Sequence, residues 1–166
     1  MKVRVAALVN DSIVDGPGLR YGLYVQGCPH RCKGCHNPQT HSFDGGTEMD
    51  TAVIWAEIAA NPLLSGITFS GGDPLCQPEP LTEIAKKGKE QGLSIWCYTG
   101  DRFEDLVAES DPMVMELLRY VDVLVDGPFL LEQRTLELPF RGSKNQRLVN
   151  VPLSLEAGKV IEASLG

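Results

Sequence analysis

Three cysteines lie close together in the stretch GCPHRCKGCHNP, where Cys28, Cys32 and Cys35 follow the spacing C-x3-C-x2-C. A disulfide pairs two sulfurs, and a closed structural zinc site takes four ligands, so three thiols on one loop fit neither use directly. Thiolates also hold iron-sulfur clusters, and three of them leave one iron of a cubane cluster free for a ligand from outside the protein. The spacing therefore predicts an open metal centre.

A structural zinc site is the alternative, because His36 and His41 follow the third cysteine and offer a fourth ligand. Unliganded cysteines fit poorly, since a structural cysteine prefers a buried apolar environment and this loop is polar and basic. The remaining two cysteines, Cys76 and Cys97, stand in apolar or peripheral stretches. We therefore assign them to packing.

The elements that position this loop follow from the alternation of apolar and polar residues. Asp50 is a candidate N-cap for a helix, and Gly92 stands where a later helix would end. Stretches rich in Val, Ile and Leu alternate with amphipathic ones, which is typical of βα units and a mostly parallel sheet. We expect strands over residues 3–9, 21–27, 66–72, 93–100, 121–129 and 146–151, and helices over residues 51–60, 81–92, 102–109 and 113–120.

The length of 166 residues fits a single α/β domain that spans residues 1–166. A complete eight-unit βα barrel takes about 250 residues, so the chain is too short to close one. We therefore expect a partial, open βα barrel of roughly five or six strands with a mostly parallel sheet. A Rossmann-like open sheet is the alternative that this order of elements also allows.

Four polar or glycine-rich segments come directly after predicted strands. They are the cysteine loop, SGGDP with Gly71, Gly72 and Asp73, YTG with Tyr98 and Thr99, and DGPF with Asp126. The carboxyl ends of parallel strands lie on one rim, where βα loops build active sites. The sequence therefore directs these segments to one place, although a glycine pair or an Asp-Gly pair is by itself also typical of a simple turn.

The composition argues against several classes of protein. A net charge of −7 is unlike a nucleic-acid binder, which needs clustered Lys and Arg. No apolar run approaches the ~18 residues of a membrane-spanning helix, and Arg4 interrupts the N-terminal apolar run, which is unlike a signal peptide. We therefore expect a cytoplasmic protein with no membrane and no nucleic-acid partner. The basic segments HRCK and RGSKNQR fit either anionic ligands or solvated loops.

The cysteine motif after an early strand resembles the signature of the radical S-adenosylmethionine (SAM) enzymes. The longer string DGPGLRYGLYVQGCPHRCKGCHNPQTH is similar to the activating proteins of glycyl-radical enzymes, above all those of anaerobic ribonucleoside-triphosphate reductases. The similarity continues through TFSGGDPL, YTG, DVLVDGPF and FRGSKNQR, so it covers most of the chain. Gly34 and His36 depart from the family, in which aromatic residues are common on either side of the third cysteine.

The resemblance implies two cofactors, a 4Fe-4S cluster on Cys28, Cys32 and Cys35, and SAM. In such enzymes the amino and carboxylate groups of SAM bind the free iron, and one electron from the cluster cleaves SAM to methionine and a 5′-deoxyadenosyl radical. The cofactors carry this chemistry, and the protein positions and shields them.

The resemblance also implies which residues meet SAM. The glycine pair lets backbone groups approach the methionine end, and Asp73 can accept hydrogen bonds from its ammonium group. Arg20 in DGPGLR is expected to steady its loop or the cofactor carboxylate. The residues that we expect to bind SAM are Gly71, Gly72, Asp73, Tyr98, Thr99 and Asp126, of which the last three would meet the ribose or the carboxylate.

The partners implied by the resemblance are a large glycyl-radical enzyme, namely the anaerobic ribonucleotide reductase, and an electron donor such as flavodoxin. A short, incomplete barrel favours a protein substrate, which can supply the missing wall, with RGSKNQR as a candidate docking segment. Three alternatives stay open: an activase of another glycyl-radical enzyme, a radical SAM enzyme that acts on a small molecule, and a non-enzymatic zinc or iron-sulfur module.

Overall fold

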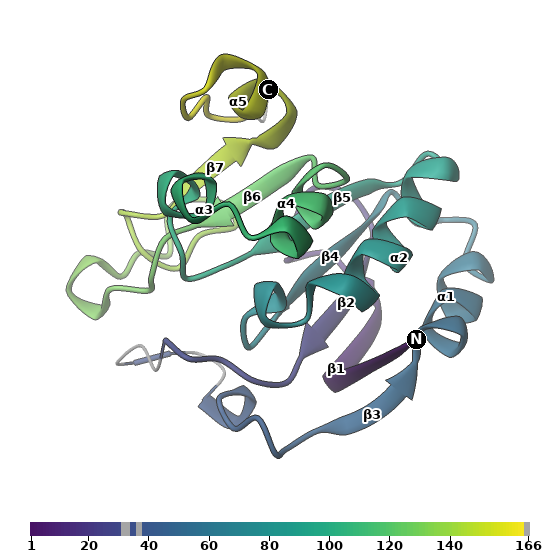
Figure 1. The fold of residues 1–166 in the computed structure, drawn as a ribbon. Coiled ribbons are helices and arrows are strands. Elements are labelled where there is room, and N and C mark those ends of the chain that lie inside the picture. Colours follow the sequence, from purple (N-terminus) through teal and green to yellow (C-terminus); the bar gives the residue numbers. More distant parts are fainter. Residues whose placement is uncertain (31–33, 36–37, 165–166) are drawn as a thin grey trace.

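The computed structural model describes residues 1–30, 34–35 and 38–164, and within them one seven-stranded sheet organises the chain (Figure 1). The order of strands across the sheet is β3-β1-β2-β4-β5-β6-β7. The strands are β1 (Lys2–Ser12), β2 (Arg20–Val25), β3 (Thr47–Asp50), β4 (Gly66–Gly71), β5 (Ser94–Tyr98), β6 (Val123–Asp126) and β7 (Arg147–Asn150).

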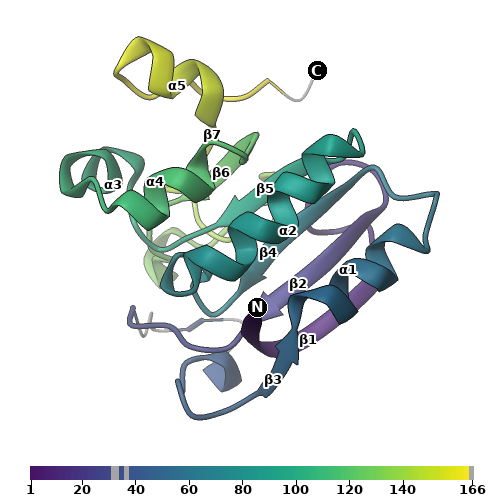
Figure 2. The ribbon, with the colours of Figure 1, turned by 45° about the vertical axis from the view of Figure 1, so that its right-hand side comes forward.

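The helices lie mainly on one face of this sheet. Figures 1 and 2 show α1, α2 and α4 side by side along that face. None of the helices in the described ranges is long and apolar enough to cross a lipid bilayer. The helices are α1 (Thr51–Ala59), α2 (Pro78–Glu90), α3 (Phe103–Glu109), α4 (Pro112–Leu118) and α5 (Val151–Ala157), with 3-10 turns η1 (Pro38–Thr40), η2 (Pro74–Cys76) and η3 (Leu131–Gln133).

The sheet has a parallel centre and antiparallel edges. Strands β2, β4, β5 and β6 pair in parallel, whereas β1 and β3 on one side and β7 on the other run antiparallel to their neighbours. The strand order advances in one direction from β2 to β6. A doubly wound Rossmann sheet reverses its order at a switch point and carries helices on both faces. The open, partial-barrel α/β prediction is therefore confirmed, with one strand more than expected, β3, and with antiparallel strands at both edges of the sheet.

The two faces of the central strands differ in character because side chains alternate along a strand. One set, which includes Leu23, Ile67 and Ile95, is fully buried in the main core beneath the helices. The opposite set is polar on β2 and β4, where it includes Arg20 and Thr68, and carries a smaller hydrophobic cluster around Trp96 on β5. The loops before β2 and after β6 cover this second face, because Thr68 Oγ1 donates to the Asp15 carbonyl and Phe140 packs on Trp96.

Arg20 stabilises the loop that precedes β2. Its side chain is fully buried and donates to the Pro17 carbonyl at 3.1 Å, to Thr68 Oγ1 at 2.8 Å and to Ser94 Oγ at 2.8 Å. Its guanidinium carbon also lies 5.7 Å from the centre of the Trp96 ring. Burial lowers the pKa of Arg20 to about 10. Of the two roles expected for this arginine, the structure supports the one within the loop.

Candidate functional site

The loops that follow β2, β4, β5 and β6 meet around one cavity of about 140 Å³. The structure places most of the predicted site residues on its lining. These residues are Cys28, Cys35, Gly71, Gly72, Asp73, Tyr98 and Thr99. Cys32 and the candidate ligand His36 lie outside the described residues. The common rim of parallel strands thus gathers these groups as the order of elements predicts.

The glycine pair lets the SGGDP loop lie directly against the start of the cysteine loop. A Cβ atom on Gly72 would lie 2.2 Å from the Gly27 carbonyl oxygen, and Gly71 has a φ of +99° that side chains rarely adopt. The Gly72 N–H donates to the Val25 carbonyl and the Asp73 N–H to the Gly27 carbonyl, both at 2.8 Å. The close approach that requires glycine is therefore made to the protein's own backbone.

The Asp73 carboxylate holds two loops in place from a buried position. Its side chain is 1% exposed. Oδ1 accepts a hydrogen bond from the Leu75 N–H at 3.0 Å, which starts η2. Oδ2 accepts from Thr99 Oγ1 at 2.9 Å and from the Gly100 N–H at 3.0 Å. The carboxylate therefore joins the end of β4 to the loop that follows β5.

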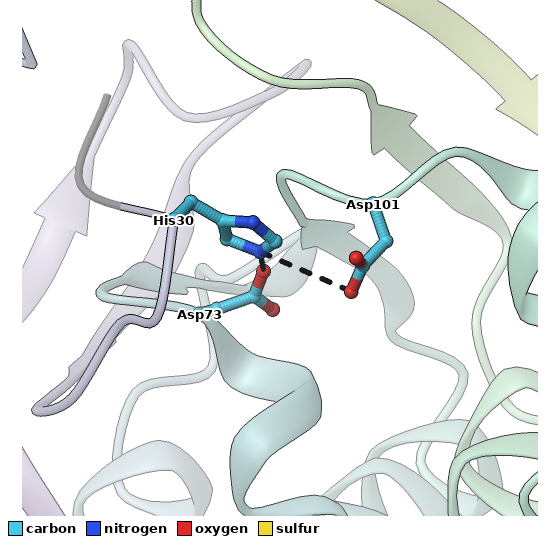
Figure 3. Close-up of side chains that lie close together, drawn as sticks. All are labelled: His30, Asp73 and Asp101. Atoms are coloured by element: carbon cyan, nitrogen blue, oxygen red, sulfur yellow. Dashed lines mark hydrogen bonds and ion pairs between the residues drawn. The ribbon is translucent and has the colours of Figure 1, made fainter. Parts of the chain in front are cut away.

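His30 adds the cysteine loop to this network (Figure 3). Its Nε2 lies 2.6 Å from Asp73 Oδ2, and because a carboxylate only accepts, the imidazole donates. The ring also rests on Gly100, where a Cβ atom would lie 2.6 Å from His30 Cδ2. The hydrogen bond to Asp73 raises the pKa of His30, and burial partly opposes this. Sequence reasoning missed His30, and its place between two predicted ligands was the available signal.

A second histidine, His41, also lines the cavity. Its carbonyl accepts a hydrogen bond from the Cys28 N–H at 3.2 Å, so the segment after η1 runs beside the start of the cysteine loop. Within the part of the chain that the structure describes, His41 Nε2 is the one buried side-chain nitrogen or oxygen without a hydrogen-bond partner. A buried polar group of this kind calls for an acceptor or donor supplied from outside the chain.

Asp126 is the predicted site residue that the structure does not bring to this cavity. Its carboxylate is 1% exposed and pairs with Arg147, with Oδ1 at 3.0 Å from Nε and Oδ2 at 2.5 Å from Nη2. Oδ2 also accepts from the Phe103 N–H at 2.8 Å, at the start of α3. Asp126 lines a separate cavity with Arg102 and Arg147. Its neighbour Gly127 is the residue that reaches the cysteine cavity.

A larger cavity of about 490 Å³ adjoins the first one on the face of the sheet opposite the main core. The two share Cys35, Ser70, Tyr98, Phe129 and Gln146 on their linings, so they are continuous. Asp15, Tyr24 and Arg141 supply polar groups to the larger cavity, and the Tyr24 hydroxyl donates to Asp15 Oδ2. Burial is the main cause of the raised pKa of Tyr98. The arrangement offers thiols at one end and a polar wall beyond them.

The residues on the lining fit an iron-sulfur cluster. Two of the three predicted cysteine ligands line one cavity, and so does His41, whose buried Nε2 has no hydrogen-bond partner among the described residues. Cys97 is fully buried in the main core, away from this lining, and Cys76 is exposed. The described thiols on this lining, Cys28 and Cys35, belong to the cysteine loop, and their role as cluster ligands stays a prediction.

Comparison with known proteins agrees with this chemistry. A family model described as a 4Fe-4S single cluster domain matches residues 14–149. Among solved structures, QueE from Escherichia coli aligns with a TM-score of 0.48 at 15% identity, over 60% of this chain and 53% of that one. At that level the structural likeness bears on neither the site nor the function.

Relatives in several organisms match over nearly the whole of their own length. All three described next are named anaerobic ribonucleoside-triphosphate reductase-activating protein. The relative from Enterobacteria phage T4 is 38% identical over 81% of this chain and 86% of its own. The Vibrio cholerae relative is 38% identical over 81% and 89%, and the Escherichia coli relative 35% identical over 81% and 90%. The chain therefore belongs to the radical SAM family of anaerobic ribonucleoside-triphosphate reductase-activating proteins.

Proposed function

We propose that this protein is a radical SAM activase that generates a glycyl radical on the anaerobic ribonucleoside-triphosphate reductase. The observation that carries the proposal is the shared cavity of Cys28, Cys35 and the SGGDP and YTG loops. The names of the relatives support the choice of partner. The whole chain, residues 1–166, acts as a single domain in this proposal.

Cys28, Cys32 and Cys35 are the proposed ligands of the 4Fe-4S cluster. When bound, the cluster would supply the single electron for the reductive cleavage of SAM, and the cleaved nucleoside would take a hydrogen atom from a glycine of the partner. The protein holds the cluster, SAM and the partner glycine close together in the correct orientation and excludes water from them. The hydrogen bonds from the Gly72 N–H to the end of β2 and from the Asp73 N–H to the start of the cysteine loop serve that purpose.

We assign SAM to the two continuous cavities. The backbone of Gly71 and Gly72 and the side chains of Tyr98 and Thr99 bound the end nearest the thiols, where we place the methionine part. We place the nucleoside in the larger cavity, on the face of the sheet opposite the main core. The Asp73 carboxylate already accepts four hydrogen bonds in a buried position, so we assign it to positioning the loops rather than to direct contact with the ammonium group.

Asp126 is likewise a positioning residue in this proposal. Its two oxygens bond Arg147 and the start of α3, which anchors the loop that carries Gly127 to the cavity. The ion pair joins β6 to β7, because Asp126 and Arg147 are direct partners in the antiparallel register. A carboxylate used in this way stabilises the wall of the site without meeting the cofactor.

The partner protein supplies the wall that the open sheet lacks. Large apolar side chains stand exposed on two loops that also contribute residues to the larger cavity: Ile13 at 73% and Val14 at 71% on the loop before β2, and Leu136 at 85% on the loop after β6. Val14 also lines the larger cavity. Exposed apolar groups beside a cavity are typical of a protein-binding surface. A glycine fits a narrow opening because it lacks a Cβ atom.

An electron donor such as flavodoxin and a cytoplasmic location complete the proposal. Both depend on the family resemblance. The donor must have a reduction potential low enough to reduce the cluster. Dithionite can replace this donor in a test.

The test is to mix cluster-loaded protein, SAM, dithionite and the reductase without oxygen. We expect methionine and 5′-deoxyadenosine by chromatography, and a glycyl-radical doublet by electron paramagnetic resonance (EPR) that requires the reductase. A competent reductase that shows no doublet while SAM is cleaved would contradict the choice of partner. Stoichiometric zinc with no iron uptake would contradict the cofactor.

A further inference from the structure

His41 Nε2 stands out because nothing in the described chain satisfies it. The atom is buried and has no hydrogen-bond partner among the residues that the structure describes. Native proteins pair buried polar groups with few exceptions, so this nitrogen calls for a partner from outside the described residues. His41 lines the cavity that Cys28 and Cys35 also line. The group that occupies this cavity is therefore the one available to His41.

The backbone fixes His41 beside the first predicted ligand. The Cys28 N–H donates to the His41 carbonyl at 3.2 Å, and the Gly27 N–H donates to the Thr40 carbonyl at 2.6 Å. These two bonds form a short ladder between the start of the cysteine loop and the segment after η1. Main-chain contacts thus hold the backbone of His41 beside Cys28, the first predicted ligand.

An imidazole in this position has two possible uses. As a base it can bind the fourth iron, but this would occupy the coordination site that SAM needs. As an Nε2–H donor it can hydrogen-bond a sulfide or a cysteinyl sulfur, and such bonds stabilise the reduced, more negatively charged cluster. Only the second use is compatible with the proposed function, on which this step rests.

We propose that His41 donates its Nε2–H to a sulfur of the bound cluster and thereby raises the cluster's reduction potential. His30, the other histidine on the lining, cannot take this role through Nε2, because that nitrogen is bonded to Asp73. The two histidines then have different roles. His30 ties the cysteine loop to the sheet, and His41 eases the transfer of one electron to the cluster.

The experiment is a redox titration of the reconstituted protein without SAM, followed by EPR of the reduced cluster. His41→Leu removes the donor, and His41→Gln keeps an N–H donor on a shorter side chain. Phe43→Leu is the matched control, because Phe43 packs on Gly27 in the same segment and offers no hydrogen bond. We expect a more negative midpoint potential in His41→Leu, a smaller shift in His41→Gln, and unchanged iron content in both.

Pulsed EPR of the wild-type cluster with ¹⁵N-labelled histidine tests the same point without a substitution. A weak nitrogen coupling is expected for a hydrogen-bonded imidazole. Strong coupling of a coordinated nitrogen, or an unchanged potential in His41→Leu, would overturn the inference. So would a loss of SAM affinity with no change in potential, which would assign His41 to SAM. Because neither measurement needs the reductase, failure to activate it would challenge the proposed function alone.

Discussion

His30 Nε2 lies 2.6 Å from Asp73 Oδ2, and this hydrogen bond ties the cysteine loop to the end of β4. The same oxygen accepts from Thr99 Oγ1 and the Gly100 N–H at the end of β5. One buried carboxylate therefore joins three of the loops that build the site. We therefore expect the position of the cysteine loop to depend on this oxygen.

Replacing Asp73 should damage the fold of the site as well as the binding of SAM. Asp73→Ala leaves the buried Leu75 and Gly100 N–H groups and the Thr99 hydroxyl without their acceptor. We expect a loss of about 3 kcal/mol in unfolding free energy, because each buried unpaired group costs roughly 1–3 kcal/mol. Urea unfolding of the cluster-free protein measures this. Full stability with weakened SAM binding would instead support direct contact between Asp73 and SAM.

The backbone contact at Gly72 gives a second prediction. In Gly72→Ala the new methyl group meets the Gly27 carbonyl at 2.2 Å, and both sides of the clash are main chain. We expect the SGGDP loop to separate from the cysteine loop, and iron content after reconstitution to fall several-fold. Gly92→Ala is the control, since it has a φ of +80° but nothing within 4 Å. It should lose about 1 kcal/mol of stability and keep its iron. Equal iron in both variants would refute the role given to Gly72.

The five cysteines should divide into two groups. Alanine at Cys28, Cys32 or Cys35 should abolish the intact cluster. Cys76→Ala and Cys97→Ala should both retain about four irons per chain, because Cys76 is exposed and Cys97 lies in the main core. Iron analysis and the visible absorption spectrum measure the outcome. An iron-free Cys76→Ala protein would show that the ligand set is wrong.

The ion pair between Glu104 and Arg147 should make stability depend on pH. Hydrogen bonding to Arg147 lowers the pKa of Glu104 from 4.5 to about 2, so its contribution is complete above pH 4.5 and disappears as the pH falls toward 2. Glu104 is half exposed, which limits the effect to about 1 kcal/mol or less. We expect Glu104→Gln to be less stable than the wild type at pH 6, with a smaller difference at pH 3. The same difference at both pH values would contradict this role.

Much of the fold could be predicted because local signals carry it. Apolar alternation predicted β2, β4 and β5, and Asp50 caps α1 as expected, with its side chain accepting from the Ala52 N–H at 2.9 Å. The short polar strand β3 has no such signal, since it forms only by pairing with β1. Helix α5 was also missed. It follows β7 directly, and the strand predicted over residues 146–151 includes its first residue, Val151.

The site was predictable where sequence order alone brings groups together. Parallel strands carry the cysteine, SGGDP and YTG loops to one rim, so their meeting follows from the order of elements. The partners of Asp126 and Asp73 depend on tertiary contacts that no local pattern shows. Arg147 reaches Asp126 through the antiparallel register of β6 and β7, and His30 reaches Asp73 through the path of the cysteine loop.

The RGSKNQR segment also makes tertiary contacts that its sequence does not indicate. Gln146 donates to the Gly127 carbonyl at 3.1 Å, and Asn145 donates to the Pro128 carbonyl at 2.8 Å. These bonds join the two ends of the loop after β6. The segment thus stabilises the wall of the site. Its use as a docking surface for the reductase stays a prediction, and reversing the charge of the exposed Lys144 tests it.

The transfer of hydrogen from the reductase to SAM's nucleoside is the step that defines an activase, and isotope labelling follows it directly. Reductase that carries glycine deuterated at Cα is mixed with cluster-loaded protein, SAM and dithionite without oxygen, and the 5′-deoxyadenosine is analysed by mass spectrometry. We expect one deuterium in the 5′-deoxyadenosine, in proportion to the glycyl radical measured by EPR. Unlabelled 5′-deoxyadenosine beside a full glycyl-radical signal, or labelled product without that signal, would contradict the proposed function.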